Sequence, residues 1–198
     1  MFLIFGLGNP GDEYEGTRHN VGRSVVSLLA KNNDFEDFVP DKKTNSLFSS
    51  GKIGKEKVQL FLPEGFMNNS GKTVLKVVKG KPPFLKVVVL HDDLDIPVGR
   101  VKISFGKKSG GHRGVESIAK AIKTNDFVRV RIGISPVTVS GKIKKPQGEK
   151  DVIDFILGKL TKKEAEDLKK NIKNGSKAIE ELVTTDLSSA MNVWNSKV

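Results

Sequence analysis

Residues 2–22 read FLIFGLGNPGDEYEGTRHNVG, a short apolar run that opens into a glycine turn and then a polar loop. The apolar run, residues 2–5, has the aromatic and aliphatic character of a buried strand, and the glycines let the chain turn sharply after it. His19 follows in the polar loop, where open α/β sheets place ligand sites. A single histidine in such a loop is either a catalytic base or a structural residue, and the spacing alone leaves both interpretations open.

The glycines of this turn also satisfy G-x-G-x-x-G, the fingerprint of dinucleotide-binding proteins. That fingerprint requires a helix opening inside it and an acidic residue at the end of a second strand about 20 residues later. Here Gly16 interrupts any such helix, and the next regular segment, residues 21–30, has helical spacing. We therefore expect no nucleotide cofactor.

The length of 198 residues is typical of one domain, and no linker divides the chain. We expect a single domain over residues 1–198, with a basic flap at about 136–150 and a C-terminal helical segment at about 161–195. The formal net charge is +11, from 34 basic and 23 acidic residues, which makes nucleic acid the first candidate partner and an anionic membrane surface the second. The absence of cysteine excludes disulfides, thiolate metal sites and a cysteine nucleophile.

No segment has the length and apolar character of a membrane span, and the first residues lack the basic leader of a signal peptide. We therefore expect a cytoplasmic protein.

Helical and strand patterns alternate along the chain, as in α/β folds. Helical spacing covers residues 21–30, with Asn20 as a candidate N-cap, and begins again near 70, 114 and 161. Strand patterns cover 47–53, 58–62, 85–90, 100–105 and 128–134, whereas 31–45 is polar and irregular.

A second polar cluster follows the aliphatic strand 85–90, in the sequence His91-Asp92-Asp93-Leu94-Asp95. Three acids beside a histidine have the oxygen-rich character of a magnesium or calcium site. Alternatively, one of these carboxylates orients His19.

The two later strands alternate apolar residues with a basic face, which carries Arg100, Lys102, Arg129 and Arg131. Between these strands, residues 110–114 form a glycine turn that opens a helix. Free backbone N–H groups at a helix N-terminus attract anions, and Lys107 and Lys108 lie next to this turn. A phosphate is the ligand that this pattern favours.

The chain has no G-x-S-x-G elbow and no histidine-rich metal spacing, so a base-activated water is the simplest chemistry that remains. Several separated motifs, in the same order, resemble the bacterial-type peptidyl-tRNA hydrolases over the whole chain. They are Gly6 to Gly11, Tyr14, Thr17-Arg18-His19-Asn20, Phe66-Met67-Asn68, Ser70-Gly71, His91 to Asp95, Gly110 to Gly114 and Phe127 to Ile134.

This resemblance implies a monomeric three-layer α/β/α sandwich with a mixed, mostly parallel sheet, without metal or cofactor. The implied reaction is cleavage of the ester that joins a peptide to the 3′ ribose of tRNA. His19 would activate the water, Asp92 would hold its ring, and Asn9 and Asn68 would grip the substrate around the ester. Tyr14 and Met67 would shape the cleft.

The chain departs from the family pattern at two positions. The family's usual His-Asn-Gly is His112-Arg113-Gly114 here, and we expect Arg113 either to contact the substrate, or to turn outward or pair with Asp93 or Asp95. Ser104 stands where many members place a lysine that partners the arginine matching Arg131 in a phosphate clamp. Lys102, Lys107 and Lys108 are the candidates to replace that lysine.

Two other functions compete with this interpretation. One is a non-catalytic relative that only binds RNA, but the presence of both His19 and Asp92 favours the enzyme. The other is a metal-dependent phosphate-ester enzyme that uses Asp92, Asp93 and Asp95.

Overall fold

The computed structural model describes residues 1–196. Its strands are β1 (Phe2–Gly6), β2 (Val39–Asp41), β3 (Ser46–Ile53), β4 (Glu56–Pro63), β5 (Phe84–Pro97), β6 (Val101–Phe105) and β7 (Phe127–Ser135). Its α-helices are α1 (Val21–Asn32), α2 (Ser70–Val77), α3 (Arg113–Ile122), α4 (Glu149–Leu157), α5 (Lys162–Thr184) and α6 (Leu187–Ser196). Three short 3₁₀ turns complete it, η1 (Asp12–Tyr14), η2 (Arg18–Asn20) and η3 (Met67–Asn69). Among these elements, β2 falls in the segment 31–45 that the sequence indicated as irregular.

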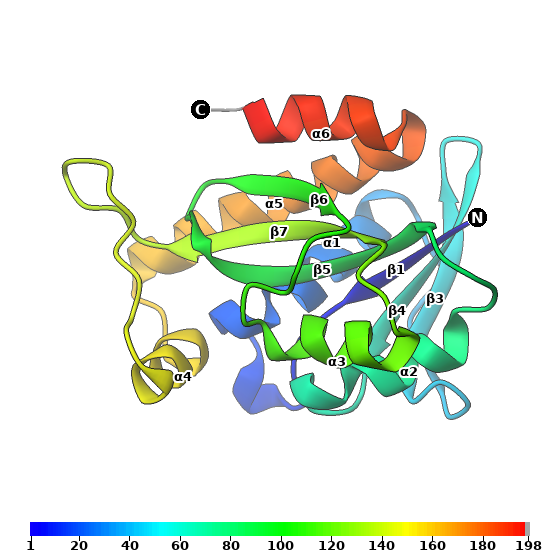
Figure 1. The fold of residues 1–198 in the computed structure, drawn as a ribbon, viewed down its shortest axis with the longest axis horizontal. Coiled ribbons are helices and arrows are strands. Elements are labelled where there is room, and N and C mark those ends of the chain that lie inside the picture. The colour runs from blue at the N-terminus through cyan, green and yellow to red at the C-terminus, as the bar shows by residue number, and fades with distance from the viewer. Residues whose placement is uncertain (197–198) are drawn as a thin grey trace.

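The seven strands form one mixed sheet in the order β2-β3-β4-β1-β5-β7-β6. The four central strands, β4, β1, β5 and β7, are parallel, whereas β2, β3 and β6 extend the two edges in antiparallel pairings. Helices α1, α5 and α6 cover one face, and α2 and α3 cover the other (Figure 1). The expected three-layer α/β/α sandwich with a mixed, mostly parallel sheet is confirmed.

The apolar run of β1 lies in the middle of this sheet and serves both cores. Ile4 packs in the core under α1 and α5, and Phe5 packs in the core under α2 and α3, both with no exposed surface. Side chains that alternate between two buried faces explain why β1 and the first half of β5 are nearly continuous apolar runs. The hydrophobic burial of these strands fixes the sheet that carries the site.

Strand β5 corrects one expectation. The apolar pattern placed its end at Leu90, but the strand continues to Pro97, so residues 91–95 lie inside the strand. Its neighbour β1 stops at Gly6, opposite Leu90, whereas β7 continues to pair with β5 as far as Asp93 and Ser135 pairs with Pro97. Because β1 ends first, the polar half of β5 has one open edge, and the polar loop after β1 turns over it.

Helix α1 packs unusually close to the ends of β1 and β5. A Cβ atom on Gly22 would lie 2.4 Å from the carbonyl oxygen of Leu90 and 2.7 Å from that of Leu7. Only glycine permits this approach, which also lets Arg23 N–H donate to the Leu7 carbonyl across 3.1 Å. The contact holds the end of the polar loop, residues 17–20, against the open edge of β5.

The C-terminal part of the described chain is helical, as expected, and α5 begins with a capping box. The Thr161 side chain accepts from Glu164 N–H, and the Glu164 carboxylate accepts from Thr161 N–H across 2.8 Å. Residues 136–148 form a loop with one antiparallel bridge, Val137 to Ile143, before α4 begins. Within residues 1–196, no helix has the length and apolar character to cross a membrane.

Candidate active site

A cavity of about 520 Å³ is lined by the loop after β1, the polar half of β5, η3, the start of α3 and helix α4. Of the seven residues expected to act in catalysis or substrate binding, six line it, although they come from five separate segments of the chain. They are Asn9, His19, Met67, Asn68, Asp92 and Arg113. Tyr14, the seventh residue that we expected at the substrate, is not among the lining residues.

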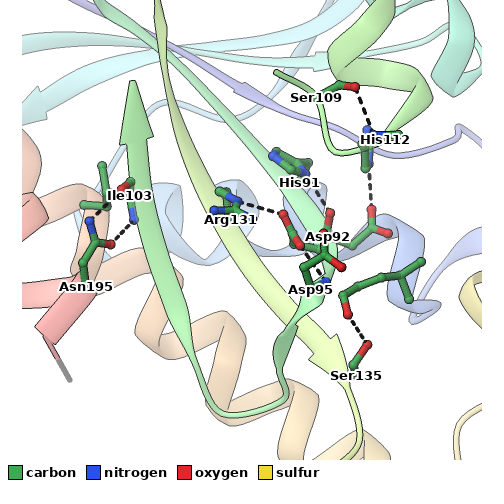
Figure 2. A network of polar contacts seen from close by, with 12 residues as sticks. His91, Asp92, Asp95, Ile103, Ser109, His112, Arg131, Ser135 and Asn195 are labelled. Atoms are coloured by element: carbon green, nitrogen blue, oxygen red, sulfur yellow. Dashed lines mark hydrogen bonds and ion pairs between the residues drawn. The ribbon is translucent and has the colours of Figure 1, made fainter. Parts of the chain in front are cut away.

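Asp92 is the carboxylate that meets His19, and the bond from Nδ1 of His19 to Oδ1 of Asp92 is 3.0 Å long. The same oxygen also accepts a hydrogen bond of 2.9 Å from Nε2 of His112 (Figure 2). All three side chains are at least nine-tenths buried. The site therefore contains two imidazoles on one carboxylate oxygen, an arrangement that the sequence analysis did not predict.

The hydrogen bonds fix the tautomer of each ring. Nδ1 of His112 accepts from the backbone N–H of Val115 at the start of α3, so its Nε2 carries the proton that is donated to Asp92. Nδ1 of His19 must also donate, because a carboxylate only accepts. In its neutral form, His19 is therefore left with an unprotonated Nε2, which is the nitrogen that can take a proton from water.

Burial alone would raise the pKa of the Asp92 carboxyl, but the charges and hydrogen bonds of His19 and His112 outweigh it. Together they hold the pKa of Asp92 well below its usual range, so the group stays ionised. A permanently charged carboxylate is the form that can orient an imidazole and stabilise its protonated state.

His112 reaches Asp92 because α3 begins very close to β1 and η3. A Cβ atom on Gly114 would lie 2.5 Å from the sulfur of Met67 and 2.9 Å from Cδ1 of Leu7. His112 also caps α3, so the N-terminus of that helix is occupied by an imidazole where the sequence suggested a phosphate. The only sequence signal for this role was a histidine directly before a helical pattern.

A third histidine, His91, lies below the pair and contacts His112, with 4.6 Å between the ring centroids. Its Nδ1–H donates to the Asp92 carbonyl across 2.7 Å, whereas its buried Nε2 has no hydrogen-bond partner among residues 1–196. Burial lowers the pKa of His91 well below the usual histidine value, and the nearby His112 and Arg129 lower it further. His91 is thus an uncharged side chain that packs beneath the site.

The asparagines of the first loop form a second network. Asn9 and Asn20 exchange two hydrogen bonds, from Asn9 N–H to Asn20 Oδ1 across 2.9 Å and from Asn20 Nδ2 to the Asn9 carbonyl across 2.8 Å. Asn9 Oδ1 then accepts from Met67 N–H across 2.8 Å. Asn20 precedes α1 but makes no side-chain cap, contrary to expectation, because this network uses its amide. Asn9 is left with its amide N–H groups for a ligand.

The acidic cluster of β5 does not converge on one point. Asp93 bonds to Arg131 across 2.8 Å, and Asp95 bonds to Lys145 of the flap across 2.5 Å. A metal site needs at least three ligands close together. Within residues 1–196, the one group of three acidic or histidine side chains whose ligand atoms all lie within 4.8 Å of one another is His19, Asp92 and His112. Their hydrogen bonds account for that proximity, since Nε2 of His112 holds a proton where a metal ligand would need a lone pair.

The expected phosphate-binding residues lie outside the cavity. Lys102 stands directly across from Arg131 on the β6–β7 pairing, and Lys107 and Lys108 are exposed on the loop before α3. Arg129 was expected on the same basic face, but it is only 2 % exposed, and burial lowers its pKa to about 10. The basic face predicted for β6 and β7 therefore lacks Arg129.

Arg113 lines the cavity and is exposed, and the expected pairing with Asp93 or Asp95 is not formed. It forms an ion pair with Glu149, the first residue of α4, and both side chains are exposed. Arg18, in contrast, is buried. It donates to the Phe155 carbonyl across 2.9 Å and to Glu164 across 2.6 Å, and it stacks on the Phe155 ring. Sequence analysis missed this structural role of the residue next to His19.

Nearly the whole chain is similar to one family of known proteins. The family model described as Peptidyl-tRNA hydrolase matches residues 3–198. The chain belongs to the peptidyl-tRNA hydrolase family. A family member from Alkaliphilus oremlandii is 39% identical over 196 residues, which cover 98% of this chain and 100% of that one, and a member from Dehalococcoides mccartyi is 38% identical over 99% and 100%.

Solved structures of the same family also match this chain. The crystal structure of peptidyl-tRNA hydrolase from Acinetobacter baumannii has a TM-score of 0.85 and 32% identity, covering 99% of this chain and 95% of that chain. The resemblance inferred from the motifs is confirmed by these matches, which extend over nearly the whole chain.

The buried, neutral His91 makes stability depend on pH. Its folded-state pKa lies below the unfolded value of about 6.5, so the unfolded chain binds a proton that the native chain does not. The free energy of unfolding should therefore fall below pH 6.5, by at most about 1.4 kcal/mol per pH unit. Urea titrations of the parent and His91→Asn between pH 5 and 7 measure this, and the variant should show a smaller slope. Equal slopes would assign the effect to other groups.

Proposed function

We propose that this chain hydrolyses the ester between the peptide and the tRNA in peptidyl-tRNA, with His19 as the base that activates water and no covalent intermediate. The observation that carries the proposal is the 3.0 Å bond from His19 to the buried Asp92 carboxylate, at the wall of a 520 Å³ cavity. Membership of the family supports the substrate.

The first step follows from the tautomer of His19. Its free Nε2 takes a proton from a water molecule while that water attacks the ester carbonyl, and Asp92 stabilises the imidazolium that forms. Collapse of the tetrahedral intermediate breaks the bond to the ribose oxygen, and the imidazolium returns the proton to that oxygen. The products are the free peptide acid and tRNA with its 3′ hydroxyl restored, and the protein ends as it began.

Donors for the oxyanion come from the amides of Asn68 and Asn9. Asn68 is exposed at the cavity on η3, and Asn9 keeps its amide N–H groups because its oxygen is used by Met67 N–H. A positioned donor of this kind typically contributes 10²–10³-fold to the rate. Met67, fixed by the same bond, forms part of the cleft wall, whereas Tyr14 does not line the cavity.

The RNA part of the substrate binds to the basic surface beside the cavity, through Lys102, Lys107, Lys108 and Arg131. Arg131 is oriented by Asp93, and Lys102 faces it on the neighbouring strand, so these two form the phosphate clamp. Ser104 is buried and uncharged, so it does not contribute a positive charge to this clamp. We also propose that the protein is a monomer and acts in the cytoplasm, where its substrate is made.

Replacing His19 by Ala should abolish hydrolysis and leave tRNA affinity within about twofold, because the base acts on water and not on the RNA. Peptide release from a defined peptidyl-tRNA measures turnover, and a filter-binding assay measures affinity. A parent protein that binds tRNA without any hydrolysis would favour the RNA-binding alternative instead.

His112→Asn separates the two roles of His112. Asparagine is also a good N-cap, so α3 should keep its start, but the bond to Asp92 is lost. With one donor fewer, Asp92 interacts more strongly with protonated His19, so the acid limb of the pH–rate profile should move to higher pH. We also expect kcat to fall about tenfold, within the worth of a hydrogen bond to a charged group. An unchanged profile, with normal urea stability, would limit His112 to capping α3.

Affinity for tRNA should depend strongly on salt, with a log–log slope of roughly −0.7 to −0.9 for each phosphate neutralised. Lys102→Gln should flatten that slope by about one unit and leave kcat unchanged at saturating substrate. The matched control is Lys55→Gln, in the turn between β3 and β4 at the other end of the sheet, which should leave the slope unaltered. If both lysines behave alike, the surface around the clamp has no special role.

A further inference from the structure

Helix α4 forms one wall of the cavity, and only its C-terminal half packs against the core, through the partly buried Phe155 and Ile156. Four of its apolar side chains line the cavity, namely Val152, Ile153, Ile156 and Leu157, yet none of its nine residues is buried. A helix of this length is not stable by itself in water, so it depends on the contacts at its two ends. In Figure 1 it lies at one end of the molecule, beyond the sheet and next to the 136–148 loop.

The two ends of α4 are held very differently. The C-terminal half is anchored by the buried Arg18, which donates to the Phe155 carbonyl and stacks on the Phe155 ring at 4.1 Å. The N-terminal half is tied by exposed ion pairs, Arg113 with Glu149 and, a few residues earlier, Lys145 with Asp95. Water and salt screen exposed pairs but not the buried anchor. The N-terminal half is therefore the end that can be released.

The pair between Arg113 and Glu149 joins opposite sides of the cavity mouth. Arg113 is the first residue of α3, Glu149 is the first residue of α4, and both line the cavity. Their side chains are 60% and 73% exposed, so solvent and a ligand can reach both groups. A guanidinium binds carboxylate and phosphate through the same donors, and any phosphate that reaches Arg113 must compete with Glu149.

We propose that Glu149 is an internal competitor for Arg113, a charge latch that holds α4 across the cavity mouth until a phosphate of the RNA takes the guanidinium. This inference rests on the proposed function, which supplies the RNA. The anion is a phosphate because the peptide's terminal carboxyl is esterified in the substrate and carries no charge. Displacement of Glu149 frees the N-terminal half of α4, while Arg18 keeps its other half in place.

A double-mutant cycle tests the competition. Glu149→Gln should lower KM for peptidyl-tRNA about two- to fivefold at low salt, the factor that corresponds to an exposed ion pair. Arg113→Met should raise KM, and Glu149→Gln should have no further effect in the Arg113→Met background. Because the pair is screened by salt, the gain in Glu149→Gln should disappear at high ionic strength.

Asp151→Asn is the matched control. It removes the same charge from the same helix, but Asp151 does not line the cavity, and among residues 1–196 it has no ion pair. An equal KM change in Asp151→Asn, or a Glu149→Gln effect that persists without Arg113, would reduce the latch to a general charge effect and overturn it.

Hydrogen exchange without substrate gives an independent measurement. The backbone amides in the N-terminal half of α4, residues 149–153, should exchange faster in both Glu149→Gln and Arg113→Met than in the parent, and at the parent rate in Asp151→Asn, whereas residues 155–157 should keep the parent rate in all three. Unchanged exchange in the two latch variants would overturn the proposal even if hydrolysis is normal. A parent protein without hydrolytic activity would instead overturn the proposed function, and the two failures are thus distinguishable.

Discussion

The site depends on one buried carboxylate. Asp92 is 4 % exposed, and a charge in such a place is costly unless it is paired and hydrogen-bonded. Both donors to its Oδ1 are imidazoles, from loops that are 93 residues apart in the chain. Asp92 therefore links η2 to the start of α3, and the same bonds select the tautomers of both rings. The geometry of the candidate site and its local stability have a common cause here, since a ring that leaves removes one of the two imidazole hydrogen bonds to a buried charge.

The sheet explains why that carboxylate is available. Strand β5 is paired on both sides up to Leu90 and on one side only beyond it, because β1 ends at Gly6. The side chains of residues 91–95 thus lie on a rigid strand next to open space, a better support for a precise site than a loop. Gly22 and Gly114 then allow α1 and α3 to approach this edge closely enough to bring His19 and His112 to one oxygen.

Periodicity predicted the fold well, because the elements that build the two cores are long and strongly patterned. It placed the end of β5 too early, since backbone pairing with β7 continues after the apolar side chains stop. The spacing also put Arg129 on the basic face, where packing in the structure buries it. The contact between His19 and Asp92 was expected from the motifs and is present, whereas the bond from His112 depends on the close approach at Gly114, which no local pattern records.

The charged residues around the cavity form ion pairs that differ in how far they are exposed to solvent. Arg131 bonds to Asp93, which is only 8 % exposed, so that carboxylate cannot leave and the arginine keeps a fixed direction. Lys145 with Asp95 and Arg113 with Glu149 are at least half exposed on both sides, so their carboxylates are easily exchanged. A chain with a net charge of +11 attracts any polyanion, and self-paired cations at the cavity lower that general attraction. For the proposed RNA substrate, binding to these cations would then be favourable only where the phosphates match their positions, which would turn a non-specific attraction into selection by shape.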